Sequence, residues 1–162
     1  MSTTSKAPSP PSPPSTDRIQ KSMVLRAPKS KVWRALTDPA QFSDWFGATL
    51  KDSFVPGAQV RGPVTHPDYE HLTMDITIER VEPERLFSWR WQPGGDPDID
   101  PAEPTTLVVF ELEDAPEGTR LTVTETGFDQ IPIARRSRAY RENDEGWTGQ
   151  MENLRQYLGR AA

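Results

Sequence analysis

The sequence contains no cysteine, only two histidines and no long apolar run. Without cysteine the chain cannot form disulfides, thiolate metal sites, iron–sulfur clusters or a cysteine nucleophile. Its apolar runs are far shorter than the roughly 20 residues that a membrane-spanning helix needs, and its first residues lack the apolar core of a secretory signal. We therefore expect a cytoplasmic protein without a membrane span.

The chain also lacks an excess of positive charge. It carries 19 basic and 24 acidic residues, a formal net charge of −5, and no block of like charge. Nucleic acids and anionic membranes are usually bound through basic surfaces. Neither is an expected partner of this protein.

No common metal or cofactor motif is present. His66 and His71 are five residues apart, which on a strand would place them on opposite faces. The acidic loop 92–104 resembles a calcium loop, but Pro101 stands where such a loop needs glycine. A Ser–His–Asp arrangement, a phosphate-binding glycine loop and a dinucleotide fingerprint are absent as well. We expect no metal and no cofactor.

Composition divides the chain into a tail and one domain. Residues 1–17 consist almost entirely of Ser, Thr and Pro, and a segment without large apolar side chains cannot offset its ordering entropy. We predict a disordered tail over residues 1–17 and a single folded domain over residues 18–160. A chain of 162 residues is long enough for one such core.

The apolar pattern of the domain changes from strand to helix and back. After a strand at 19–26, Pro28 and Asp38-Pro39 each start a short helix. From Ala48 onward the apolar period is two. It predicts antiparallel strands at 49–53, 59–64, 72–79, 87–91, 105–113 and 119–126. The phase slips near Glu79-Arg80, which predicts a β-bulge.

The last long segment, residues 132–158, has helical periodicity. Tyr140, Trp147, Met151, Leu154 and Leu158 fall on one apolar stripe at 100° per residue. Asn143 lies on the same stripe, and a break of the helix before it is an open alternative.

Gly146 and Gly149 also lie in this segment, although glycine costs about 1 kcal/mol against alanine in a helix interior. We expect these glycines to bring the helix backbone close to a sheet or a ligand.

These elements predict an α+β helix-grip fold. A curved antiparallel sheet of six to seven strands would wrap around the long C-terminal helix, with two short helices after the first strand. Only that helix is long enough to cover the apolar face of the sheet. A cavity is expected between sheet and helix.

Several motifs resemble a known superfamily as an ordered set. They are Val32-Trp-Arg-Ala-Leu-Thr-Asp-Pro39, Trp45-Phe-Gly47, Val81-Glu-Pro83, Phe87-Ser-Trp-Arg-Trp91, Gly118-Thr-Arg-Leu-Thr-Val-Thr-Glu125 and Gly146-Trp147. Over residues 19–158 the chain resembles the SRPBCC (START-like) superfamily, in the branch named after the C-terminal domain of the activator of Hsp90 ATPase. The resemblance implies a helix-grip fold and a deep hydrophobic cavity for small ligands. It does not imply one activity, because both binders and enzymes share this fold, and it does not carry over the co-chaperone role.

The candidate ligand-binding residues are mainly aromatic side chains and methionines expected inside the cavity. They are Trp45, Met74, Trp89, Trp91, Phe110, Glu125, Asn143, Trp147 and Met151. For each hydrophobic one taken singly, ordinary core packing is the alternative interpretation. As a group they suit a flat or irregular apolar ligand.

Glu125 and Asn143 are the polar candidates. If Val123 faces inward, the strand period puts Glu125 inward too, where a carboxylate needs a hydrogen-bond partner. Asn143 could donate that bond. A structural tie between helix and sheet is favoured over a catalytic role, although a pocket carboxylate could act as a general acid or base.

Three functions therefore stay open, with the first favoured over an enzyme. The protein is a cofactor-free binder of a small hydrophobic or amphipathic molecule, a cyclase- or dehydratase-type enzyme using Glu125 and Asn143, or a chaperone-linked interaction module. A homodimer is also left open, as is a role in stress response.

Overall fold

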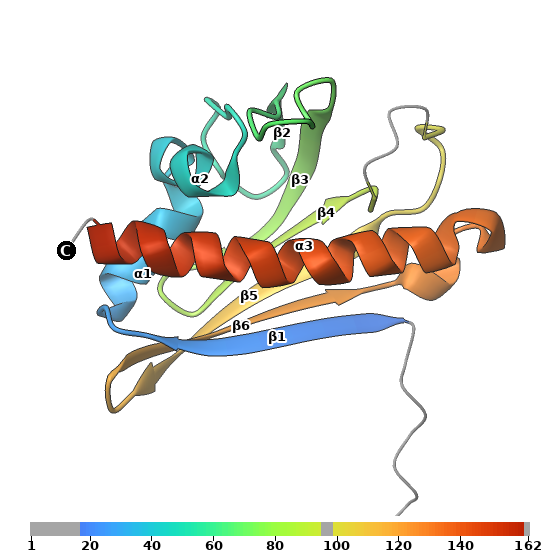
Figure 1. The fold of residues 1–162 in the computed structure, drawn as a ribbon. Helices are drawn as coiled ribbons and strands as arrows, with labels where there is room; N and C mark the ends of the chain where they lie inside the picture. Colours follow the sequence, from blue (N-terminus) through green and yellow to red (C-terminus); the bar gives the residue numbers. More distant parts are fainter. Residues whose placement is uncertain (1–16, 95–98, 161–162) are drawn as a thin grey trace, which may run out of the picture.

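The computed structural model describes residues 17–94 and 99–160. All but the last residue of the tail predicted over 1–17 lies outside this range. The described elements are β1 Arg18–Leu25, α1 Lys29–Thr37, α2 Pro39–Phe46, β2 Gln59–Pro63, β3 Thr73–Glu82, β4 Leu86–Trp91, β5 Thr106–Ala115, β6 Gly118–Thr126, a 3-10 turn at Phe128–Gln130 and α3 Ile133–Arg160 (Figure 1).

The described strands form one antiparallel sheet of six strands in the order β1-β6-β5-β4-β3-β2. Strands β2 to β6 follow one another as neighbours, and β1 pairs with β6 at the far edge. The two short helices separate β1 from β2, so the first strand is free to join the last one. This is the helix-grip α+β fold that the sequence predicts.

Two details of the strand prediction can be checked against the register. The expected bulge is present, because pairing between β3 and β4 shifts between Ile78 and Arg80. The strand predicted at 49–53 is wrong: this segment is irregular, and only a single bridge joins Ala48 to Val64. Its single apolar residue, Leu50, is buried against the core without a regular ladder.

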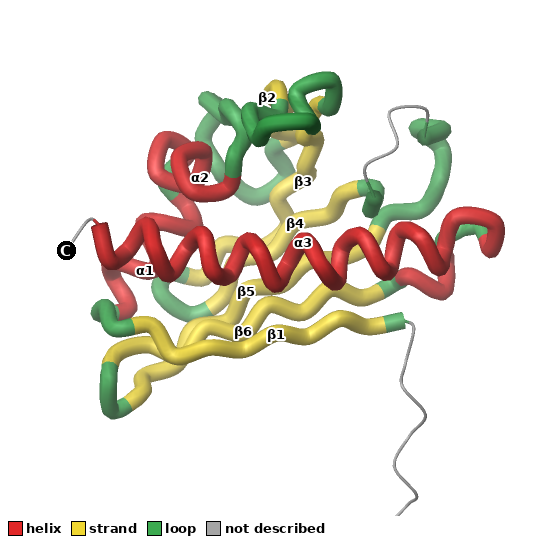
Figure 2. The backbone as a smooth tube through the Cα atoms, viewed as in Figure 1, coloured by secondary structure: helices red, strands yellow, loops and turns green. Residues whose placement is uncertain are grey.

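Helix α3 is one uninterrupted helix of 28 residues that crosses one face of the sheet (Figure 2). It buries Ala139, Trp147, Met151, Leu154 and Leu158, largely the stripe that the sequence predicts. The helix does not break before Asn143. Its two interior glycines are compatible with helical geometry and weaken the helix without ending it.

The sheet opens at one end, between β3 and β4. The last pair joining these strands is Thr77 with Arg90, whereas residues 73–76 of β3 pair only with β2. Figure 1 shows the two strands diverging there. Trp91 of β4 therefore has no partner in β3.

Candidate functional site

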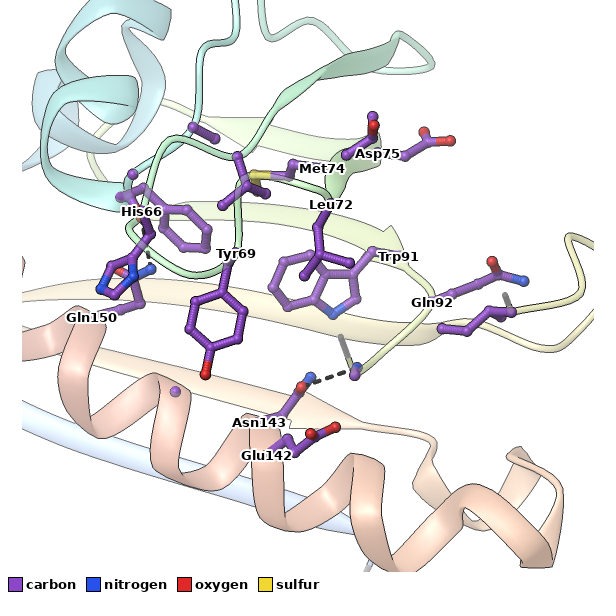
Figure 3. Close-up of a pocket in the computed structure, with 18 of the residues that line it drawn as sticks. His66, Tyr69, Leu72, Met74, Asp75, Trp91, Gln92, Glu142, Asn143 and Gln150 are labelled. Atoms are coloured by element: carbon purple, nitrogen blue, oxygen red, sulfur yellow. Dashed lines mark hydrogen bonds between the residues drawn. The ribbon is translucent and has the colours of Figure 1, made fainter. Parts of the chain in front are cut away.

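The described structure has a cleft of about 1210 Å³. It lies between α3, the loop 64–72 and the open end of β3 and β4 (Figure 3). Its apolar lining comes from the sheet, from α2 and from loops, and comprises Phe46, Val64, Leu72, Met74, Trp91 and Ile99. The polar lining on the helix comprises Glu142, Asn143, Glu145, Gln150 and Asn153. The lining on α3 is therefore polar, whereas the rest of the lining mixes these apolar residues with polar ones such as Arg61, His66 and Thr77.

Both faces of β3 contribute to the cleft, since the sheet is open there. Met74 lines it from the inner face, and Asp75 lines it from the outer face. Asp75 pairs with Arg61 at 3.3 Å, and the nearby Arg90 pairs with Glu79 at 2.7 Å. The arginines at the outer rim are thus already neutralised.

Behind the cleft wall, Glu125 is completely buried at 0% exposure. Trp91 and Trp147 each donate an indole N–H to it at 2.8 Å, one to each carboxylate oxygen. Asn143 donates from Nδ2 to both oxygens, at 2.9 and 3.0 Å. The hydroxyl of Thr106 donates to the same oxygen as Trp91. We call these five residues the carboxylate cluster.

The position of Glu125 follows from strand alternation. Leu121 and Val123 of β6 are buried on the same face, so the period of two carries Glu125 into the interior. A carboxylate there is tolerated only when its oxygens are hydrogen-bonded. Its four donors come from β4, β5 and α3, so the cluster ties the helix to the middle of the sheet.

Asn143 links the cluster to the cleft and to a loop. Its Nδ2 faces Glu125, while its Oδ1 accepts a hydrogen bond from the backbone N–H of Gly94 at 3.1 Å. Asn143 and Trp91 line the cleft, and Glu125 lies behind them. The hydrogen bond between Asn143 and Glu125 that the sequence suggested is therefore present.

The structure divides the predicted ligand-binding residues into two groups. Met74, Trp91 and Asn143 line the cleft. The others are buried away from its surface: Trp45, Trp89, Phe110, Glu125, Trp147 and Met151.

Aromatic side chains fill the space where the sequence suggested a deep cavity. The ring of Trp89 lies 5.2 Å from that of Phe110 and 6.3 Å from that of Trp147. Trp45 donates its indole N–H to the carbonyl of Ala35 at 2.8 Å and so joins α2 to α1; it also borders a smaller hollow of about 320 Å³. Alternation shows that these residues point inward, but it does not show whether they pack together or leave a space.

Sequence reasoning missed several cleft residues, which lie in loops, at the end of α2 or on the face of α3 beside the apolar stripe. They are Phe46, His66, Tyr69, His71, Glu142, Glu145, Gln150 and Asn153. On the helix, the spacing of residues 142, 145, 146, 149, 150 and 153 is a usable signal, because steps of three and four mark one face. The loop residues carry no comparable pattern.

The two histidines do line the cleft, as neighbours of Tyr69. The ring of His66 lies 5.5 Å from that of Tyr69, and its Nδ1 is 2.9 Å from the carbonyl of Pro67. Within residues 17–94 and 99–160, no group of three or more metal-ligating side chains occurs. Over the same ranges no helix is both long and apolar enough to cross a membrane.

Comparison with known proteins gives a family and a fold. The family described as "Activator of Hsp90 ATPase homolog 1-like protein" matches residues 26–159. We found no match among curated proteins.

Among solved structures, protein MLL2253 from Mesorhizobium loti is 27% identical, with a TM-score of 0.72, and the match covers 90% of this chain and 98% of that one. DynU16, from the dynemicin biosynthetic locus, is 28% identical with a TM-score of 0.68; the match covers 88% of this chain and 47% of that one. Ms6760 from Mycobacterium smegmatis is 21% identical with a TM-score of 0.71, and the match covers 91% of this chain and 94% of that one. At this identity the match shows a shared fold alone.

Proposed function

The chain belongs to the family of activator of Hsp90 ATPase homolog 1-like proteins, and from this premise we propose that it binds a small amphipathic molecule in the cleft beside α3. The observation that carries the proposal is an apolar patch inside a cleft whose lining is otherwise largely polar. Leu72, Met74 and Trp91 offer apolar surface on one side, and amide and carboxylate side chains of α3 face them (Figure 3). Concave sites with apolar walls and a few polar groups are typical of small-molecule binding.

The size of the cleft also suits a small molecule. Its volume of about 1210 Å³ somewhat exceeds that of typical ligand pockets, which span roughly 300 to 1,000 Å³, so a small molecule has room to enter. The cleft is open to solvent, so a ligand would enter without any rearrangement of the core and would leave part of its surface exposed.

The position of Glu125 favours binding over acid–base catalysis by this residue. A general acid or base must come within hydrogen-bond reach of the substrate. Glu125 is fully buried, and both its oxygens already accept hydrogen bonds from side chains of the cluster. We therefore assign Glu125 a structural role, as the tie that holds Trp91 and Asn143 in the cleft wall.

One similar protein supports a small-molecule ligand. DynU16 is described as a protein of the dynemicin biosynthetic locus, which associates a domain of this fold with the production of a small molecule. This chain spans about half of DynU16, so the association concerns the shared domain.

The proposal can be tested with the fluorescent dye anilinonaphthalene sulfonate, which combines apolar rings with a charged group. We expect the folded protein to bind the dye at a single saturable site. Tyr69 lines the cleft and is 51% exposed, so Tyr69→Ala should not disturb the core. It should weaken dye binding roughly three- to tenfold, the range of one lost aromatic contact.

Val55→Ala is the matched control, because Val55 is 52% exposed but lies outside the cleft. This variant should bind the dye as the wild type does. Absence of saturable binding by the wild type would overturn the proposal. Equal losses in the two variants would also overturn it, because the dye would then bind somewhere else.

A further inference from the structure

Gly146 and Gly149 of α3 face open space. A Cβ atom added at either position would have no atom of the described residues within 4 Å outside the local helix. The sequence predicts that these glycines bring the helix close to a sheet or a ligand. Close approach to the sheet is wrong, since the buried stripe lies on a different face of α3; close approach to a ligand stays a prediction. By contrast, a Cβ at Gly62 would lie only 1.8 Å from the carbonyl oxygen of Thr49.

No backbone requirement explains the two glycines either. Both lie within the regular helix, and neither has a positive φ angle. Alanine would stabilise a helix at these positions. Folding alone therefore does not account for glycine at either site.

Both glycines line the cleft. They are three residues apart, so they lie on one face of the helix, about 4.5 Å apart along its axis. Over this distance the wall consists of bare backbone, with the amide side chains of Asn143 and Gln150 at its two ends. This length of bare backbone is comparable to the width of one aromatic ring.

The sheet side of the cleft carries a flat and rigid aromatic surface. Trp91 is half-buried, and its indole N–H is held by Glu125 at 2.8 Å. Its ring packs 5.8 Å from that of Trp147 and 5.4 Å from that of Trp89. Since its only polar atom is occupied, Trp91 presents the cleft with ring surface, and Leu72 and Met74 extend that surface.

We propose that the ligand of this cleft contains a flat ring system, which lies between the Trp91 side of the cleft and the bare backbone at Gly146 and Gly149. The two glycines then determine specificity, because a methyl group at either position would occupy the space of the ring. This inference rests on the proposed binding function and adds the shape of the ligand.

The test uses two cationic probes of different shape, measured by calorimetry. Aminoacridine is flat and rigid, whereas decylamine is a flexible chain of the same charge. In the double variant Gly146→Ala/Gly149→Ala, we expect aminoacridine affinity to fall at least about tenfold, as for one misplaced methyl group in a fitted pocket. Decylamine can bend around a methyl group, so its affinity should change much less.

Gly159→Ala provides a matched control. Gly159 also lies in α3 with open space around it, but it is not part of the cleft. Its binding of both probes should equal that of the wild type. The melting temperature of the double variant should equal or exceed that of the wild type, which separates lost binding from lost folding.

The outcomes separate this inference from the proposed function. If the wild type fails to bind anilinonaphthalene sulfonate, the binding function itself is overturned. If it binds the dye but not aminoacridine, or if the double variant keeps its aminoacridine affinity, only the flat-ring inference is overturned. An equal loss of affinity for both probes would likewise overturn the inference, because the glycines would then provide room without selecting for the shape of the ligand.

Discussion

Asn143 and Glu125 form a bidentate contact in which one amide nitrogen donates to both carboxylate oxygens, at 2.9 and 3.0 Å. The contact joins the middle of α3 to the end of β6 across the interior. Since the Oδ1 atom of Asn143 also accepts from the N–H of Gly94, one side chain holds a helix, a strand and a loop together. The stability of the cleft wall should therefore depend on this pair.

Glu125→Gln should destabilise the protein by about 2 to 4 kcal/mol. The substitution replaces one acceptor oxygen by an NH₂ group that faces donors, so at least one buried donor loses its partner. Urea unfolding followed by circular dichroism measures the change. Glu111→Gln on the exposed face of β5 is the control and should stay near the wild-type value. An unchanged midpoint for Glu125→Gln would mean that the carboxylate is not buried as described.

Trp91→Phe and Trp147→Phe form a matched pair. Each removes an indole N–H that donates to Glu125 at 2.8 Å, so both should lower stability, by about 1 to 3 kcal/mol. Only Trp91 lines the cleft. Titration with anilinonaphthalene sulfonate should therefore show weaker binding for Trp91→Phe and wild-type binding for Trp147→Phe. The reverse pattern would place the ligand in the core.

Asn143→Leu should release the backbone at Gly94, which lies in the segment after β4. Leucine fits the apolar stripe of α3, but it removes the donor to Glu125 and the acceptor for the Gly94 amide. We expect a loss of about 1 to 3 kcal/mol and faster hydrogen exchange at the Gly94 amide. Exchange measured by NMR tests this directly. Unaltered protection of the Gly94 amide against hydrogen exchange would contradict its hydrogen bond to Asn143.

Arg135→Gln should cost about 1 kcal/mol, more than a surface ion pair usually contributes. Arg135 and Glu103 are each only 20% exposed and lie 3.0 Å apart, and Arg135 also donates to the carbonyl of Pro93. Arg138→Gln is the control, because its pair with Glu142 is 67% and 40% exposed at 3.4 Å. Thermal unfolding at low and high salt compares them. Equal losses of stability in the two variants would show that the contacts of Arg135 stabilise the protein no more than an exposed ion pair does.

Much of the fold could be predicted because its signals are local. The alternation from Leu72 to Ile78 and the slip before Val81 predict strand β3 and its bulge. The helical stripe predicts that Trp147 and Leu158 face the core. The strand predicted at 49–53 is wrong, because the one apolar residue of this segment, Leu50, does not distinguish a strand from irregular buried chain.

The sequence by itself determined that Glu125 faces inward and that Asn143 lies on the apolar stripe of the C-terminal helix. Both follow from the side-chain periods of a strand and a helix. The tertiary structure decided which inward residues meet a ligand. Trp89, Phe110 and Trp147 pack on one another and close the space beneath the helix, while Trp91 remains at a cleft surface. That division depends on the separation of sheet and helix and on where β3 leaves β4. These distances arise from packing among residues far apart in the chain, and no local period encodes them.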